Sequence, residues 1–128
     1  MTRNEAEAYA RQWASDWNRL DLEAVFAHFE EGIVWSSPKA TEAVGVPTVC
    51  GKSALRDYLV RVLRPVTALR FTVHRVIWDR ETSELSIIYD REINGQRDRA
   101  SEILHFAGSG RVDRGEVHYG VVPQVART

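Results

Sequence analysis

The residues best suited to acid–base chemistry lie on a predicted β-hairpin around Asn94-Gly95. This dipeptide is a strong signal for a two-residue turn, because both positions accept a positive φ. The register that such a turn imposes places Glu102 opposite Ile87. Tyr89 lies diagonally near Glu102 on the same face of the hairpin, and Arg91 lies further toward the turn.

This face is the more apolar of the two, and we expect it to face the helices; its apolar members are Leu85, Ile87, Ala100 and Leu104. A carboxylate buried among such neighbours must be stabilised or used. Burial would raise the pKa of Glu102, whereas Arg91 would lower it. Three interpretations stay open: an acid–base group, a carboxylate half exposed at a sheet edge, or a structural pairing with an arginine or a tyrosine hydroxyl.

Composition is typical of a soluble globular protein with one domain, spanning 1–128. The net charge of −1 gives no electrostatic reason to expect a nucleic acid or a membrane as partner. The lone Cys50 cannot form an internal disulfide, and the N-terminus lacks the apolar core of a signal peptide. We therefore expect a cytoplasmic protein.

Three helices are predicted before the main run of strands. The first spans residues 4–18, where aromatic and small residues recur at helical spacing. Asp21 should cap a second, short helix that runs through Phe29, with Gly32 as its left-handed end. Ser53 is the expected cap of a third helix, which Pro65 stops.

The strand pattern makes the fold α+β, with a mostly antiparallel sheet. A first strand covers residues 33–37 and is closed by Pro38, and residues 39–50 read as a loop that serves as a lid or packs on a neighbouring subunit. Period-two alternation predicts further strands over 69–78, 85–93, 99–107 and 111–121.

Several other side chains are candidates for a pocket. Aromatic residues at such spacings either form the core or wall a hydrophobic pocket, and the expected lining is Trp13, Trp17, Trp35, Ile87, Leu104 and Tyr119. The four histidines show no metal-ligand spacing, so we expect neither a metal nor another cofactor. His28 is the best alternative acid–base group, although a surface role is the more common one for a histidine.

Three segments resemble the SnoaL-like branch of the NTF2-like superfamily. They are the Trp-Asn-x-x-Asp type step in residues 17–26, the strand ending at proline in residues 32–38, and the glycine followed by a helix in residues 51–59. The resemblance implies a cystatin-like cone, in which a curved sheet wraps around the helices and leaves a cavity.

The ketosteroid isomerases of this superfamily use an aspartate base, a tyrosine and a protonated aspartic acid. The matching positions in this chain are Ser37, Trp13 and Glu102, of which only Glu102 keeps its chemistry. A serine needs an activating partner to act as a base. The chain is therefore not expected to be a standard ketosteroid isomerase. Limonene epoxide hydrolases, which this fold also resembles, need an Asp-Arg-Asp set that Arg91, Asp98 and Glu102 imitate only loosely.

Together these features predict a protein that binds a small hydrophobic or cyclic carbonyl compound. Glu102 would act in cofactor-free isomerisation, cyclisation or dehydration, with Tyr89 and Ser37 as hydrogen-bond partners and Arg91 as a tuning or anion-holding charge. The alternative is a non-catalytic ligand-binding or dimerisation module. A homodimer is expected through the outer face of the sheet, around Val76, Trp78, Ile88 and Ile103.

Overall fold

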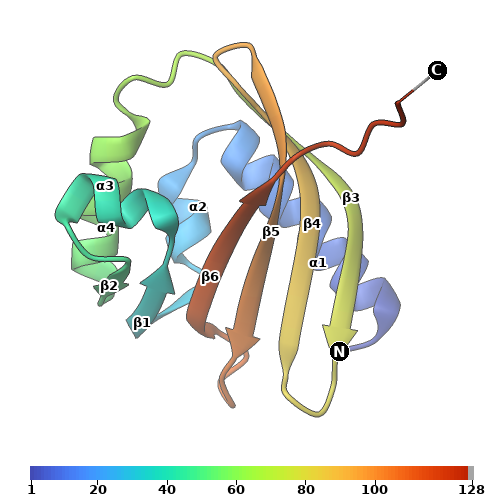
Figure 1. Ribbon diagram of the computed structural model, residues 1–128. Coiled ribbons are helices and arrows are strands. Elements are labelled where there is room, and N and C mark those ends of the chain that lie inside the picture. Colours follow the sequence, from blue (N-terminus) through green and yellow to red (C-terminus); the bar gives the residue numbers. More distant parts are fainter. Residues whose placement is uncertain (127–128) are drawn as a thin grey trace.

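In the computed structural model, which describes residues 1–126, helix α1 (Arg3–Asn18) begins at a capping box. The Thr2 hydroxyl accepts from the Glu5 backbone N–H, and the Glu5 side chain accepts from the Thr2 N–H. The helix lies across one face of the sheet (Figure 1). The side chain of Asn18 holds the end of the helix on β3 (Leu69–Asp79). Its Nδ2 donates to the Phe71 carbonyl at 3.0 Å, and its Oδ1 accepts from the Phe71 N–H at 2.6 Å.

Helix α2 (Leu22–Phe26) is shorter than predicted. Asp21 caps it as expected, accepting from the Ala24 N–H at 3.1 Å. The expected continuation to Phe29 and the left-handed stop at Gly32 are both wrong, because strand β1 (Phe29–Ser36) already begins at Phe29 and contains Gly32. Pairing with β6 overrides the local helical pattern, and it starts with the hydrogen bond from the Val112 N–H to the His28 carbonyl.

The predicted loop over residues 39–50 is also wrong. Ser37 and Pro38 open a helix, α3 (Pro38–Val44), which ends at Gly45 with a φ of 84°. Strand β2 (Thr48–Cys50) follows and pairs with β1. Helix α4 (Lys52–Leu63) then begins at Gly51 without a side-chain cap, so Ser53 does not have the capping role expected of it. Helices α3 and α4 stand together beside β1 and β2 (Figure 1).

The sheet has the order β2-β1-β6-β5-β4-β3. Its β1–β6 pair is parallel and all its other pairs are antiparallel, as expected for a mostly antiparallel sheet. The four long strands agree with the predictions within three residues at each end: β3 (Leu69–Asp79), β4 (Glu84–Ile93), β5 (Gln96–Phe106) and β6 (Val112–Gly120). The fold is therefore α+β with a cone-like wrap of sheet around helices (Figure 1).

The register predicted for the β4–β5 hairpin is confirmed along its length. Ile87 pairs with Glu102 and Leu85 with Leu104. Asn94 and Gly95 take φ values of 51° and 82°, as a turn of this kind requires. The apolar face of the hairpin is buried against the helices, as expected.

One expectation about the outer face of the sheet is wrong. Strand β3 carries a bulge at His74, where the pairing passes from Val73–Tyr89 to Arg75–Ile88. The extra residue reverses which side chains face inward. Val76 and Trp78 therefore pack against the core, whereas Ile88 and Ile103 keep the outward positions proposed for a dimer contact. The homodimer itself stays a prediction.

The core joins α1 to the centre of the sheet. Ala6 and Ala10 allow close approach of the helix, and the largest fully buried side chains include Phe26, Ile33 and Leu55. Among residues 1–126, no helix combines the length and apolar character that a bilayer crossing needs.

Gly115 on β6 has a packing role, because the Trp35 indole lies directly over it. A Cβ at this position would lie 2.4 Å from Trp35 Cζ3 and 2.5 Å from Cε3. Such distances cannot be accommodated without moving the ring or the strand. The Trp35 ring can therefore occupy its place in the interior only because residue 115 lacks a side chain.

We predict that Gly115→Ala lowers the free energy of unfolding by about 1–3 kcal/mol, the usual cost of overpacking a core. Urea unfolding followed by tryptophan fluorescence measures this loss. Gly120→Ala is the matched control in the same strand, since its new Cβ would meet only the Arg99 carbonyl at 3.6 Å. Equal stability of the two variants would contradict the packing role of Gly115.

Candidate functional site

A cavity of about 260 Å³ opens between α4, the end of α1 and the inner face of the sheet. Its wall is mainly apolar and aromatic; the lining includes Trp17, Trp35, Tyr58, Leu59, Val62, Leu63, Leu69, Phe71, Tyr89, Ile93, Val117 and Tyr119. Polar groups are few, and the carboxyl of Glu102 is one of them. An apolar pocket with a small number of polar groups is the usual form of a small-molecule site.

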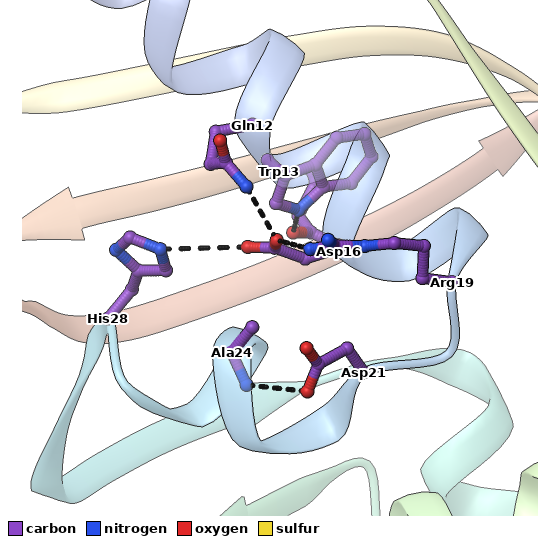
Figure 2. Close-up of polar contacts among 8 residues, drawn as sticks. Gln12, Trp13, Asp16, Arg19, Asp21, Ala24 and His28 are labelled. Atoms are coloured by element: carbon purple, nitrogen blue, oxygen red, sulfur yellow. Dashed lines mark hydrogen bonds and ion pairs between the residues drawn. The ribbon is translucent and has the colours of Figure 1, made fainter.

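Glu102 is the only buried acid in this wall among the described residues, with 3% of its surface exposed. Its Oε2 accepts a hydrogen bond from Trp13 Nε1 at 2.6 Å, which Figure 2 marks as a dashed line that leaves the Trp13 indole on α1. Burial raises the pKa of Glu102 from its usual 4.5 to about 8, and the Trp13 hydrogen bond opposes part of that rise. At neutral pH most of the carboxyl therefore keeps its proton.

The position of Glu102 follows from strand alternation. It lies on the central strand β5, between Ile87 of β4 and Val117 of β6, which are both buried. These neighbours exclude water from both sides, and within residues 1–126 no cation is among the causes that set the pKa of Glu102. Arg91, which was expected to lower this pKa, is not among the causes that set it.

Arg91 is instead engaged by Asp98. Its Nε and Nη2 donate to the two carboxylate oxygens at 2.7 and 2.8 Å. This pair lies two inner-facing positions from Glu102 toward the turn. The Arg91 guanidinium also stacks 4.3 Å from the centre of the Tyr119 ring, so it borders the cavity as part of a fixed pair.

Tyr89 is buried and lines the cavity beside Glu102. Its ring meets Trp13 edge to face, with 4.7 Å between centroids. Burial, followed by the charge of Glu102, raises the pKa of Tyr89 well above its usual range. The phenol therefore stays protonated and is available to donate a hydrogen bond.

Ser37 lies near two further tyrosines that border the cavity. Its hydroxyl accepts from the Lys39 backbone N–H at 3.2 Å, which fixes it as the cap of α3. Burial raises the pKa of both Tyr58 and Tyr119, and an interaction with the Ser37 side chain works against that rise. Among residues 1–126, the Ser37 hydroxyl makes no hydrogen bond to a histidine or a carboxylate that would activate it as a base.

The other predicted pocket residues divide into two groups. Trp17, Trp35 and Tyr119 line the cavity. Trp13, Ile87 and Leu104 are buried in the core and do not line it. Trp13 nevertheless reaches the site through its bond to Glu102.

Tyr58 was not singled out by sequence reasoning as a site residue. Tyr58 belongs to the apolar stripe of the helix that is now α4, and its spacing in that stripe predicts a residue of the core. The hydroxyl that a phenylalanine would lack was the one available signal, because a buried tyrosine oxygen usually meets a polar partner.

The histidines lie outside this cavity. His28, the alternative acid–base candidate, faces the buried Asp16 at 3.7 Å, together with Gln12 and Arg19 on the other oxygen (Figure 2). His105 contacts Asp113 at 2.5 Å, and His118 contacts Glu116 at 3.0 Å. Over residues 1–126, no group of three or more potential ligands is placed to hold a metal ion.

Asn94 closes the rim of the cavity at the hairpin turn. Its Oδ1 accepts from the Thr67 N–H and hydroxyl and from the Ala68 N–H, and its Nδ2 donates to the Pro65 carbonyl. The turn residue thus fastens the segment that follows α4. Its polar atoms are used by the fold and are not free for a ligand.

We predict that wild-type stability falls as pH rises from about 4.5 to about 8. In this range the unfolded Glu102 loses its proton while the folded one keeps it, so ionisation favours the unfolded state. Glu102→Gln keeps a neutral side chain at every pH. The free energy of unfolding of this variant, relative to that of wild type, should therefore rise by roughly 3–5 kcal/mol between about pH 4.5 and about pH 8. Urea unfolding at a series of pH values measures this difference, and parallel curves for the two proteins would refute the raised pKa.

We also predict that Trp13→Phe raises the pKa of Glu102 further, because it removes the hydrogen bond that stabilises the carboxylate. NMR of protein labelled with ¹³C at the glutamate carboxyl carbon measures this pKa directly. Trp17→Phe is the matched control, since the Trp17 N–H has no partner among the described residues. An unchanged pKa in Trp13→Phe would show that the indole N–H does not act on Glu102.

Comparison with solved structures shows the same fold elsewhere. A SnoaL-like protein of unknown function from Burkholderia thailandensis E264 is 27% identical over 93% of this chain and 97% of that chain, with a TM-score of 0.83. An NTF2-like protein of unknown function from Burkholderia pseudomallei K96243 is 18% identical over 93% and 92%, with a TM-score of 0.74. TerC, co-crystallised with polyporic acid, is 15% identical over 91% and 90%, with a TM-score of 0.72.

The last two likenesses show the fold alone. No curated protein matches this chain in sequence. The SnoaL-like domain, however, matches residues 10–116, which is most of the chain and includes α4, the hairpin and Glu102. This protein therefore belongs to the SnoaL-like domain family.

Proposed function

We propose that this protein binds a small hydrophobic or cyclic carbonyl compound in the cavity and moves a proton on it without a cofactor. One observation carries the proposal: a buried carboxyl with a pKa of about 8 borders a mainly apolar cavity. A carboxyl that titrates near neutral pH exchanges a proton readily in either direction. Perturbed groups in clefts are frequent at active sites.

The chemistry assigned to Glu102 is that of a proton shuttle. About a tenth of the carboxyl is ionised at pH 7, given its pKa. This carboxylate would remove a proton from the carbon beside the carbonyl; the C–H electron pair would form a C=C bond while the C=O π pair moves to the carbonyl oxygen. In a β,γ-unsaturated ketone, returning the proton to the γ-carbon as the C=O bond re-forms completes an isomerisation with no net loss or gain of atoms.

Tyr89 supports this step as a donor. Its phenol keeps its proton at neutral pH and borders the same cavity as Glu102. A hydrogen bond from this hydroxyl would stabilise the oxygen on which negative charge develops. Dehydration and cyclisation would need the same two roles, with the proton delivered to a hydroxyl or to a second carbonyl.

The neighbour TerC, crystallised with polyporic acid, supports a small cyclic ligand in this fold. The competing proposal is a non-catalytic binding module. It is favoured by Ser37, which lacks an activating base, and by Trp13, which already occupies one oxygen of Glu102. The two proposals differ in whether proton transfer occurs, and not in whether a ligand binds.

A two-step experiment separates them. A thermal-shift screen of cyclic ketones, phenols, epoxides, steroids and polyketide-like aromatics identifies ligands, since binding to the native state raises Tm. Exchange of the carbonyl's α-protons in D₂O, followed by NMR, then measures proton transfer on each ketone that binds. We expect exchange to rise with pH through about 8 if Glu102 is the base.

Glu102→Gln should slow this exchange by a factor of about 10²–10⁴, the usual contribution of general acid–base catalysis. Ligand binding should persist in this variant. Glu116→Gln, on the outer face of β6, is the control and should leave exchange unchanged. Undiminished exchange in Glu102→Gln would remove Glu102 from the mechanism, and binding without exchange in wild type would favour the non-catalytic module.

A further inference from the structure

Lys39 introduces a cation at the mouth of the cavity that the proton-transfer chemistry does not use. Its Nζ lies 5.1 Å from the centre of the Tyr119 ring, and the residue is part of the cavity wall. Within residues 1–126 no carboxylate pairs with this ammonium, whereas Lys52, the chain's second lysine, lies 3.9 Å from Glu31. A partly buried ammonium beside an apolar cavity is available to an anion.

Arg91 is the other cation in the wall, but it is already neutralised. Both of its contacts to Asp98 are short, and the pair stays together on one face of the hairpin. An anionic ligand at Arg91 would have to compete with a built-in bidentate partner. The free positive charge of the cavity is therefore at Lys39.

The positions of the two functional ends set the length of a ligand. Glu102 pairs across the sheet with Val117, and Tyr119 lies two residues further along β6 on the same face. Two residues of strand span roughly 7 Å. A ligand that reaches from Glu102 to the ammonium above Tyr119 therefore needs two polar ends separated by about one ring.

Cavity size points to the same class. The volume of about 260 Å³ exceeds the ~150 Å³ of a cavity known to hold benzene. It suits one ring or two fused rings, flanked by Trp17, Trp35 and Phe71. A steroid-sized compound would protrude from the mouth.

We propose that the ligand is a compact keto acid of one or two rings, whose carboxylate binds Lys39 while its carbonyl lies beside Glu102. The carbonyl end rests on the proposed function of Glu102; the carboxylate end rests on Lys39 alone. The reverse orientation would bury the carboxylate beside the carboxyl of Glu102, away from any cation, at a large desolvation cost.

Hydroxyl groups at the mouth add to the Lys39 end. Tyr58 and Tyr119 border the cavity near Ser37, and burial keeps both phenols protonated. Protonated phenols donate hydrogen bonds to carboxylate oxygens. The mouth thus offers one charge and several donors, whereas the deep end offers one acid.

A matched pair of probes tests this proposal: a tetralone carboxylic acid, with its carboxyl group on the aromatic ring distal to the ketone, and its neutral methyl ester. Quenching of tryptophan fluorescence reports binding, because Trp17 and Trp35 line the cavity. We expect wild type to bind the acid about tenfold more tightly than the ester, as a hydrogen bond to a charged group would give. Lys39→Met should abolish this preference by weakening binding of the acid to the level of the ester.

Lys39→Arg keeps the charge and should retain most of the preference. Lys52→Met removes the other lysine and should retain all of it. Equal binding of acid and ester by wild type, or a preference that survives in Lys39→Met, would overturn the role of Lys39 and leave the proposed function standing. Failure of wild type to bind either probe would overturn both.

Discussion

The candidate site depends on a carboxyl group that is removed from water and that no cation among residues 1–126 compensates. Glu102 is held by a single indole N–H from Trp13, and every other neighbour across the strands is apolar. An ionised carboxylate in this setting is costly, so the group remains largely protonated at neutral pH. That arrangement requires three elements at once: α1 must deliver the indole, the β4–β5 hairpin must deliver the acid, and α4 must leave a space through which the acid is reached.

The space beside Glu102 is kept open by contacts that are themselves closely fitted. Gly115 lets the Trp35 ring lie flat against β6, and Asn94 ties the hairpin turn to the segment after α4. Asn18 fixes the end of α1 to the edge strand at Phe71. Trp35, Asn94 and Phe71 all line the cavity, so each of these contacts fixes a part of its wall. A rigid, mostly apolar cavity is what raises the pKa of its one buried acid.

Local signals in the sequence predict the part of the site that depends on regular strands. The Asn94-Gly95 turn fixes the register, and alternation then places Glu102 and Tyr89 on the buried face. The bulge at His74 was not predictable in this way, because a bulge breaks the alternation on which the method rests. Helix α3 and strand β2 were missed because their stability comes from packing on β1 and α4, and short elements carry little periodic pattern of their own. Trp13 and Glu102 are 89 residues apart, and no local pattern in the sequence predicts their contact. Only the family resemblance, which matches both positions to one site, indicated that they could lie together.

That contact also narrows the chemistry. In the ketosteroid isomerases that this chain resembles, a tyrosine and a protonated acid hold the oxygen while a separate aspartate moves the proton. In this chain Trp13 occupies the position that matches the tyrosine, and its one N–H donates to Glu102. Ser37 occupies the position that matches the base, and its hydroxyl caps α3. Under the proposed function, Glu102 would be the carboxyl that moves the proton, and Tyr89, which lines the same cavity, would hold the oxygen. A site with one titrating group favours reactions in which a proton leaves and returns through the same carboxyl over reactions that need an acid and a base at opposite ends of the ligand.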